Sequence, residues 1–148
     1  MNILVSHCFL GEPCRYDGTS RLDRQVIELH RAGHNLIPVC PEVLGGLDVP
    51  RAPTEIQPDG RVVTRDGEDV TQAYRAGAER ALEIAKENGC TVAVLKARSP
   101  SCGCGEIYDG SFTGVVKSGW GVAASLLAEA GIEVMDEEHL QAWLYQSS

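Results

Sequence analysis

The chain has few aromatic residues and no long apolar run. Aromatic residues make up 5% of its 148 residues. No stretch approaches the roughly 18 consecutive apolar residues that a membrane helix needs. The first residues, MNILVSHCFLGEP, lack the basic n-region of a signal peptide. We therefore expect a cytoplasmic protein with no membrane partner.

The chain also lacks an excess of basic charge. Its net charge of −8 leaves no basic face to displace counterions from duplex nucleic acid, so we expect no such partner. A small anionic substrate is compatible with this charge, because a few local cations can hold one phosphate against an acidic background.

The six cysteines lack the spacing of a structural zinc site. Such a site usually shows paired C-x2–4-C knuckles, whereas this chain offers C-x5-C at Cys8–Cys14 and C-x-C at Cys102–Cys104. In the reducing cytoplasm we do not expect disulfides, so metal binding or catalysis is the better interpretation.

Short β-like runs alternate with amphipathic helical segments. The pattern predicts strands at 2–6, 36–40, 91–96 and 132–135, and helices at 23–32, 70–88, 121–130 and 137–145. Pro38 indicates that the second strand lies at a sheet edge. We expect loops over 41–69 and 97–117, with a β-hairpin at 54–64 that turns at residues 58–60.

Strands separated by helices predict parallel β-α-β crossovers. The expected fold class is α/β, a Rossmann-like three-layer domain with a short, mostly parallel central sheet and a small β-hairpin insertion. We expect a single domain over 1–148. No G-x-G-x-x-G pattern follows the first strand, so no motif supports dinucleotide binding.

Three cysteines follow three of the predicted strands. Cys8, Cys40 and Cys102 each lie at or just after a strand end, and the carboxyl ends of parallel strands share one rim, where ligands usually bind. We expect these thiols to converge. Their spacing fits either a catalytic zinc with an open position or an iron–sulfur cluster. We expect Cys90 to be a buried structural residue that packs like a small hydrophobic side chain.

Longer blocks of sequence connect the chain to a known family. In order, the chain contains SHCFLGEPCRYDG, PVCPEVLGGLDVPR, DG-x-DVT, LKARSPSCG and IYDGSFTG. Together these blocks resemble the bacterial and archaeal thiouracil desulfidase family in its short, stand-alone form. The first block departs from the family's S-A-C-L-L-G pattern at His7 and Phe9, neither of which is a ligand position.

The resemblance implies a [4Fe-4S] cluster held by Cys8, Cys40 and Cys102. We assign Cys14 and Cys104, the nearby thiols, as non-ligands. It implies non-redox, hydrolytic desulfuration of thiolated uracil compounds, such as 4-thiouridine monophosphate and 2- or 4-thiouracil, to the uracil form plus sulfide. Three cysteine ligands leave one iron open to bind the substrate sulfur as a Lewis acid.

Hydrolysis needs a group that moves protons. Glu42 lies two residues after Cys40 and is our candidate for the base that activates water and then protonates the sulfur. Ser101 is the candidate partner of Glu42, of the water or of the sulfur, and Ser99 is the fallback. The alternative for both serines is turn formation in the Ser-Pro-Ser loop.

Candidate substrate-binding residues flank the same loops. For a phosphate they are Arg15 and Lys96 first, then Arg98, Lys117 and backbone amides near Gly103. For stacking on a pyrimidine they are Tyr16 and Tyr108. Solvated charges and loop packing are the alternative roles.

Two other functions stay open at this point. One is a non-catalytic iron–sulfur or zinc module that senses redox state or docks a partner. The other is a zinc-dependent hydrolase of nucleotide-like substrates. Cluster binding without turnover indicates the first, and zinc without acid-labile sulfide indicates the second.

Overall fold

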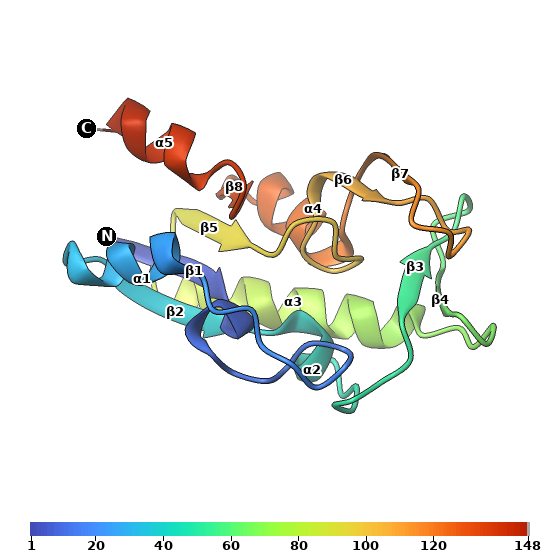
Figure 1. Ribbon diagram of the computed structural model, residues 1–148. Helices are drawn as coiled ribbons and strands as arrows, with labels where there is room; N and C mark the ends of the chain where they lie inside the picture. The colour runs from blue at the N-terminus through green and yellow to red at the C-terminus, as the bar shows by residue number, and fades with distance from the viewer. Residues whose placement is uncertain (148) are drawn as a thin grey trace.

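A four-stranded parallel sheet forms the centre of the molecule (Figure 1). The computed structural model describes residues 1–147, with side chains for residues 1–144; Ser148, the last residue of the expected domain, lies outside this range. The strands are β1 (Asn2–Ser6), β2 (Asn35–Val39), β5 (Val92–Leu95) and β8 (Glu133–Asp136). Their order is β2-β1-β5-β8, so the strand that carries Pro38 is at the edge, as predicted.

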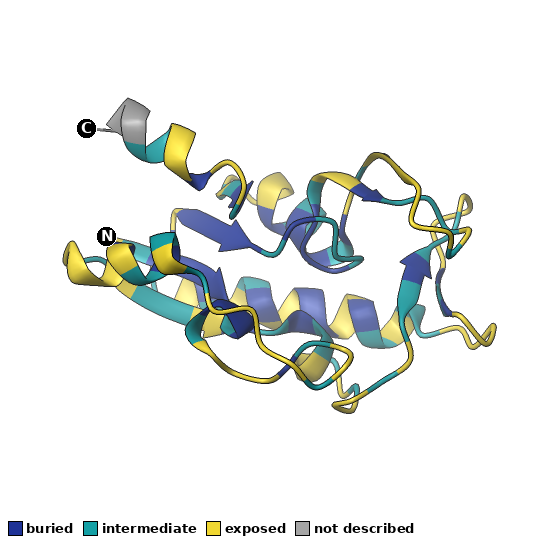
Figure 2. Ribbon diagram, viewed as in Figure 1, coloured by how far each residue is buried: buried dark blue, intermediate teal, exposed yellow. Residues whose placement is uncertain are grey.

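Helices cover both faces of this sheet. They are α1 (Arg24–Arg31), α3 (Thr71–Glu87), α4 (Val122–Glu129) and α5 (Leu140–Ser147). In the described part of the chain, none is long and apolar enough to cross a membrane. Figure 2 shows α3 with one buried side and one exposed side, and the inner strands as buried.

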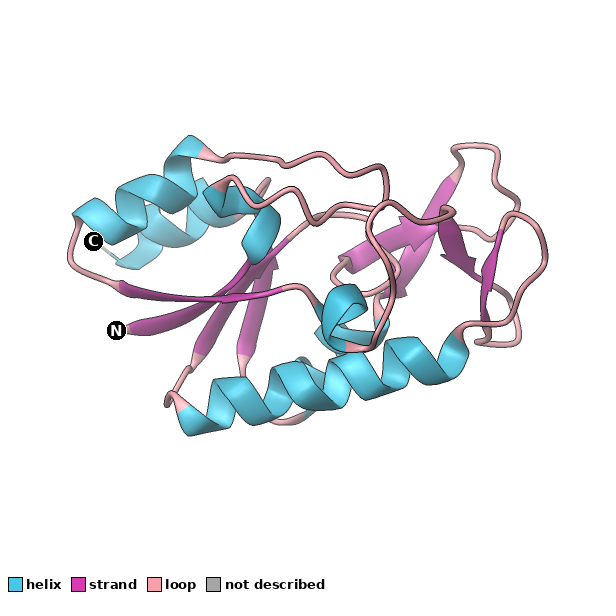
Figure 3. Ribbon diagram, turned by 90° about the horizontal axis from the view of Figure 1, so that it is seen from below, coloured by secondary structure: helices cyan, strands magenta, loops and turns pink. Residues whose placement is uncertain are grey.

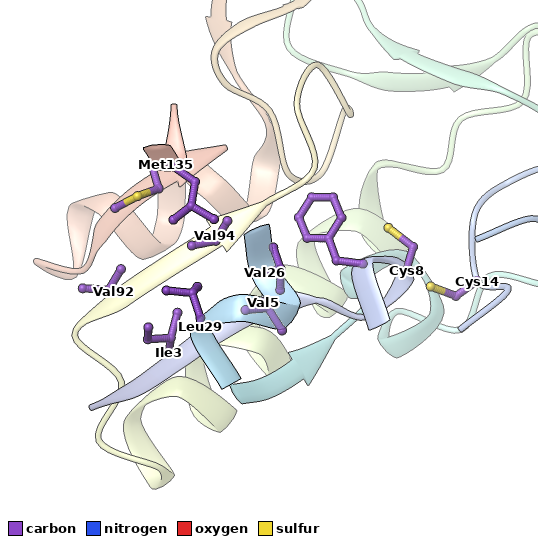
Figure 4. Packing of buried hydrophobic residues seen from close by; sticks show 11 residues of the cluster. Ile3, Val5, Cys8, Cys14, Val26, Leu29, Val92, Val94 and Met135 are labelled. Carbon is purple, nitrogen blue, oxygen red and sulfur yellow. The ribbon is translucent and has the colours of Figure 1, made fainter. Parts of the chain in front are cut away.

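The alternation of side chains along β1 builds two separate cores. Ile3 and Val5 pack with Leu29 of α1 and Leu140 of α5, and this cluster is drawn in Figure 4. Leu4 points to the other face, where its cluster includes residues of α3 and α4, among them Leu127. Strand β1 is thus apolar on both sides, as a buried parallel strand must be. Helices pack on each face of the sheet, so the expected three-layer α/β arrangement is confirmed.

Two small antiparallel sheets lie beyond the carboxyl ends of the parallel strands (Figure 3). The first joins β3 (Thr54–Ile56) to β4 (Val62–Thr64) and is the predicted hairpin. The second joins β6 (Cys104–Tyr108) to β7 (Val116–Trp120), where a loop was expected. That prediction was wrong because β7 is largely exposed and shows no apolar alternation.

Three further differences come from short or capped elements. The 3-10 helix η1 (His7–Leu10) and the helix α2 (Pro41–Leu44) are each 4 residues long, too short to show a helical period. The last helix begins at residue 140 instead of 137. Asp136 accepts hydrogen bonds from the backbone amides of Glu138 and His139, both at 3.0 Å, and this turn delays the helix.

The short helix α2 packs directly against the backbone of α3. A Cβ atom on Gly77 would overlap the carbonyl oxygen of Pro41, and one on Gly45 would overlap that of Ala73. Two glycines facing each other therefore allow the helices to touch backbone to backbone. This contact fixes the position of α2, which follows Cys40 and carries Glu42.

We predict that Gly77→Ala destabilises the protein. Alanine normally stabilises a helix by about 0.5–1 kcal/mol relative to glycine, but here the added methyl group forces α2 and α3 apart, at a cost of roughly 1–3 kcal/mol. Urea unfolding measures the change. The control is the neighbouring exposed Ala76, where Ala76→Gly should be destabilising by about 1 kcal/mol. A stabilising Gly77→Ala would contradict the contact.

Candidate active site

A pocket of about 360 Å³ opens at the carboxyl ends of β1, β2 and β5. The chain leaves β1 toward β2 on one side, while β5 lies on the other, so the pocket sits where the strand order reverses. Loops separate at such a point and leave a crevice. Cys8, Cys40 and Cys102 all line it, so the predicted convergence of the three strand ends is confirmed.

A fourth thiol joins them from the first loop. Cys14 also lines the pocket, and its side chain lies beside that of Cys8 at one end of the core cluster (Figure 4). A hydrogen bond with the Cys40 thiol lowers the pKa of Cys14, while one with the Cys8 thiol and burial raise it, to about 11 in balance. Cys8, Cys14 and Cys40 therefore form one contiguous group of sulfur atoms.

Cys102 completes the group from the loop after β5 and is 5% exposed. Its sulfur lies 3.4 Å from the Ser101 hydroxyl and 3.7 Å from that of Ser6. Burial raises the pKa of Cys102 to about 12. The hydrogen bond from Ser101 lowers this pKa, whereas the electrostatic effects of Cys40 and Glu42 raise it further. Burial and nearby negative charge thus favour the protonated thiol, and a positively charged partner such as a metal is needed to stabilise the thiolate here.

The donor set suits an iron–sulfur cluster better than a single ion. Across residues 1–147, no three His, Cys, Asp or Glu side chains are placed to bind one metal ion together. Cysteines of a cluster bind separate iron atoms, so their sulfurs need not converge on a point, and thiolates are the ligands that these clusters take. The cysteines at the strand ends fit that requirement.

Glu42 lies at the edge of the sulfur group and is held by four side chains. Its Oε1 atom accepts hydrogen bonds from Arg51 Nε at 3.0 Å and from the Tyr74 hydroxyl at 2.9 Å. Its Oε2 atom accepts from Ser101 Oγ at 2.9 Å and from Ser99 Oγ at 3.5 Å. The glutamate side chain is only 13% exposed, so these bonds replace water around a buried charge.

Arg51 connects this carboxylate to the surrounding backbone. Its Nη2 atom donates to the carbonyl oxygen of Cys14 at 3.0 Å, and Nη1 donates to that of Asp48 at 3.1 Å. Burial lowers the pKa of Arg51, but the charge and hydrogen bond of Glu42 raise it, and the rise prevails. The guanidinium therefore fixes Glu42 and the Cys14 loop together.

Tyr74 supports Glu42 from helix α3. Its hydroxyl also contacts Thr54 Oγ1. Burial, followed by the negative charge of Glu42, raises its pKa. The phenol therefore stays protonated and donates its hydrogen to the carboxylate.

The two serines have different surroundings. Ser101 is 1% exposed, and its hydroxyl lies between Glu42 and the sulfur of Cys102. Ser99 Oγ accepts from the backbone amides of Ser101 and Cys102, both at 3.1 Å. Ser99 thus forms the expected turn, whereas the Ser101 hydroxyl contacts both the carboxylate and the thiol.

Two of the candidate phosphate-binding residues already form ion pairs with carboxylates. Arg15, Lys96 and Arg98 line the pocket, but Lys96 Nζ lies 3.1 Å from a Glu137 carboxylate oxygen and Arg98 lies 2.6 Å from one of Glu138. The charges of Lys96 and Arg98 are therefore already neutralised.

Two other candidates for phosphate binding lie away from the pocket's open space. Lys117 is an exposed residue of β7. Gly103 is buried, and its amide donates to the Ser99 carbonyl at 2.8 Å. This amide is used within the turn and is not free to bind a substrate.

The aromatic candidates Tyr16 and Tyr108 both line the pocket, and Tyr16 is 43% exposed.

The remaining cysteines lie elsewhere. Cys90 is buried in the core beside α3, consistent with the expected hydrophobic role. Cys104 Sγ lies 3.8 Å from Asp136 Oδ2.

Sequence reasoning missed four residues that contact this site. They are Ser6, Arg51, Thr54 and Tyr74. Ser6 opens the block SHCFLGEPCRYDG and Arg51 closes the block PVCPEVLGGLDVPR, so these blocks were the available signal for both residues. Tyr74 lies on the long helix α3, where its spacing is that of an ordinary core residue, so nothing in the sequence indicated its contact with Glu42.

Comparisons with known proteins point to one family. A family model described as 2-thiouracil desulfurase matches residues 3–139. The chain is 41% identical over 150 residues to the uncharacterized protein YbbK of Bacillus subtilis (strain 168), covering 93% of this chain and 97% of that protein. A solved structure of the [4Fe-4S]-dependent thiouracil desulfidase TudS is 44% identical, with a TM-score of 0.89, and the match covers 99% of this chain and 97% of that chain.

We predict that Arg51→Ala strongly destabilises the protein. The substitution leaves the Glu42 charge buried without its cation, which costs about 3–5 kcal/mol. Urea unfolding under anaerobic conditions measures the loss. The control is Arg31→Ala, which removes an exposed pair with Glu28, 72% and 61% exposed, and should cost no more than about 1 kcal/mol. Equal losses in both variants would contradict the assigned role of Arg51.

Proposed function

The chain belongs to the 2-thiouracil desulfurase family, and from this premise we propose that it catalyses [4Fe-4S]-dependent, hydrolytic desulfuration of thiolated uracil compounds. The candidate substrates are 2- and 4-thiouracil and 4-thiouridine monophosphate. Water supplies the oxygen of the uracil product, the sulfur leaves as sulfide, and no electron is transferred. We assign the reaction to the reducing cytoplasm, where cysteine thiols persist.

One observation carries the proposal. The Glu42 carboxylate is held beside the cysteine group, and its Oε2 atom is hydrogen-bonded to a serine whose hydroxyl lies 3.4 Å from Cys102 Sγ. A carboxylate fixed next to sulfur ligands can transfer protons in the reaction. A binding module would have no need to bury one there.

We assign the cluster to Cys8, Cys40 and Cys102, one from each of three strand ends. Cys14 shares its loop with Cys8 and is left as a non-ligand. When bound, the cluster supplies a Lewis-acidic iron without a cysteine ligand, which accepts the substrate sulfur and polarises its bond to the ring carbon.

Glu42 is the group that transfers protons in the proposed reaction. Arg51 and Tyr74 occupy its Oε1 atom, so the Oε2 atom is the one that faces Ser101 and the reaction. There it accepts one proton as water adds to the ring carbon, and it passes that proton to the departing sulfur. The second proton of the water is lost when the carbonyl forms and also leaves with the sulfur, so the thiocarbonyl and water give the carbonyl and hydrogen sulfide, and Glu42 ends the reaction ionised as it began.

Ser101 orients the reacting groups. Its hydroxyl hydrogen is donated to Glu42 Oε2 at 2.9 Å, so its oxygen lone pairs remain able to accept from water. Since the side chain is held in a tight turn by Ser99, little motion is needed to position the water. Fixed geometry of this kind lowers the entropic part of a reaction barrier.

We predict that the three assigned cysteines are needed for the cluster. Cys8→Ser, Cys40→Ser and Cys102→Ser should each purify anaerobically with far less than the about four iron atoms expected per chain. Cys14→Ser should retain them, as should Cys90→Ser, a buried cysteine of the other core. Iron and acid-labile sulfide analysis measures the content. Loss of iron in Cys14→Ser with retention in Cys40→Ser would overturn the assignment.

We predict that Glu42→Gln abolishes turnover and leaves the cluster in place. Glutamine keeps the shape of the side chain but cannot accept the proton, so sulfide release from 4-thiouracil should fall by about 10² to 10⁴. Absorbance and iron content should match the wild type. The control is the exposed Glu28→Gln, which should be fully active. Sulfide release at the wild-type rate by Glu42→Gln would rule out Glu42 as the base.

A further inference from the structure

Ser6, the last residue of β1, joins the ends of two neighbouring strands through its side chain. Strands β1 and β5 run side by side (Figure 1), and their parallel pairing ends with Val5 opposite Val94. Just beyond this point, the Ser6 hydroxyl accepts a hydrogen bond from the backbone amide of Lys96 at 2.9 Å. Ser6 is 3% exposed. The hydroxyl is therefore held at the place where the chain leaves β5 for the loop that carries Cys102.

The alternation of side chains along β1 turns Ser6 toward the sulfur of Cys102. Side chains two residues apart in a strand point to the same face, so Ser6 shares a face with Leu4. That face is covered by the core cluster that contains both Leu4 and Cys102. The Ser6 hydroxyl forms a hydrogen bond with Cys102 Sγ at 3.7 Å.

The hydrogen of the Ser6 hydroxyl is available for this sulfur. A serine hydroxyl donates one hydrogen and accepts through two lone pairs. The Lys96 amide uses a lone pair of Ser6, which leaves the hydrogen for Cys102. Ser101 Oγ also lies close to this sulfur, at 3.4 Å, but its hydrogen is donated to Glu42 Oε2 at 2.9 Å. Of the two hydroxyls, Ser6 is therefore the donor to the sulfur.

We propose that Ser6 is a positioning residue whose hydrogen bond to the Cys102 sulfur raises the reduction potential and the Lewis acidity of the cluster. The inference rests on the proposed function, in which Cys102 is a cluster ligand. A hydrogen bond draws electron density from a thiolate, and hydrogen bonds to the sulfurs are among the factors that set the potential of an iron–sulfur cluster. Iron with less electron density is a stronger Lewis acid. Ser6 thus acts through Cys102 on the binding of the substrate sulfur.

The test measures the reduction potential of the cluster-loaded protein under anaerobic conditions. Ser6→Ala removes the donor, so its midpoint potential should be more negative than that of the wild type. Ser6→Thr keeps the hydroxyl on a residue suited to a strand and should restore the wild-type potential. With iron content unchanged, kcat/KM for 4-thiouracil should fall about two- to tenfold in Ser6→Ala, the effect of one hydrogen bond.

Resonance Raman spectroscopy gives a second readout of the same hydrogen bond. The donated hydrogen exchanges with solvent, so the iron–cysteine stretch of the wild type should shift on transfer from H2O to D2O. Ser6→Thr should show the same shift, and Ser6→Ala a smaller one. If Ser6→Ala does not retain the cluster, the wild-type and Ser6→Thr spectra decide, because a stretch that is insensitive to D2O in both would overturn the inference.

The matched control is Thr64→Val in β4. Thr64 is also buried, at 7% exposure, and its hydroxyl also accepts a hydrogen bond from a backbone amide, that of Glu68, at 3.0 Å. It does not belong to the residues that line the pocket. The substitution therefore removes the same kind of structural contact and should leave the potential and the activity at their wild-type values. A shift in potential equal to that of Ser6→Ala would overturn the role of Ser6.

The outcomes separate this inference from the proposed function. If the wild type releases sulfide from 4-thiouracil but Ser6→Ala has the wild-type potential, the role of Ser6 is overturned and the function stands. If the wild type binds the cluster and releases no sulfide, the proposed function fails, and the potentials of Ser6→Ala and Ser6→Thr still decide on Ser6. A wild type that takes up no cluster would overturn both.

Discussion

The burial of the Glu42 carboxylate is the constraint on which the rest of the site depends. An ionised carboxylate removed from water must be hydrogen-bonded and paired. Here its partners come from three separate parts of the chain: the segment after α2, helix α3, and the loop after β5. Each partner must be in place for the charge to be tolerated. Satisfying this one group therefore brings Cys40, the Cys14 loop and Cys102 to fixed positions around the pocket.

Much of the fold, and part of the site, follow from the sequence because they depend on local pattern. Buried parallel strands are apolar on both faces, and Pro38 marks an edge, so the central sheet is visible without long-range information. Parallel strands also end on one rim, so cysteines that follow strand ends are expected to meet. Cys8, Cys40 and Cys102 meet there for that reason, although local spacing could not distinguish iron from zinc. The family blocks made that distinction.

The remainder could not be predicted because it depends on contacts between distant residues. Tyr74 has the spacing of a core residue, and only the approach of α2 to α3 turns its hydroxyl toward Glu42. Lys96 and Arg98 look like free cations in the sequence, and their partners lie about 40 residues away in the turn before α5. Strand β7 is held by pairing with β6 rather than by apolar alternation. Phe112 owes its position to a carboxylate on another hairpin.

These long-range contacts make the two ends of the pocket chemically different. At its buried end are sulfur atoms and the Glu42 carboxylate, which Arg51 and Tyr74 hold through one oxygen while Ser101 donates to the other. At its exposed end, the guanidinium of Arg65 lies over the ring of Phe112. In the proposed reaction, the sulfur of a thiolated pyrimidine enters toward the cysteines, and the sulfur-bearing carbon then lies beside Glu42. The residues that allow Glu42 to be buried as a charged group therefore also hold it beside the cysteines, where the proposed reaction needs a group that transfers protons.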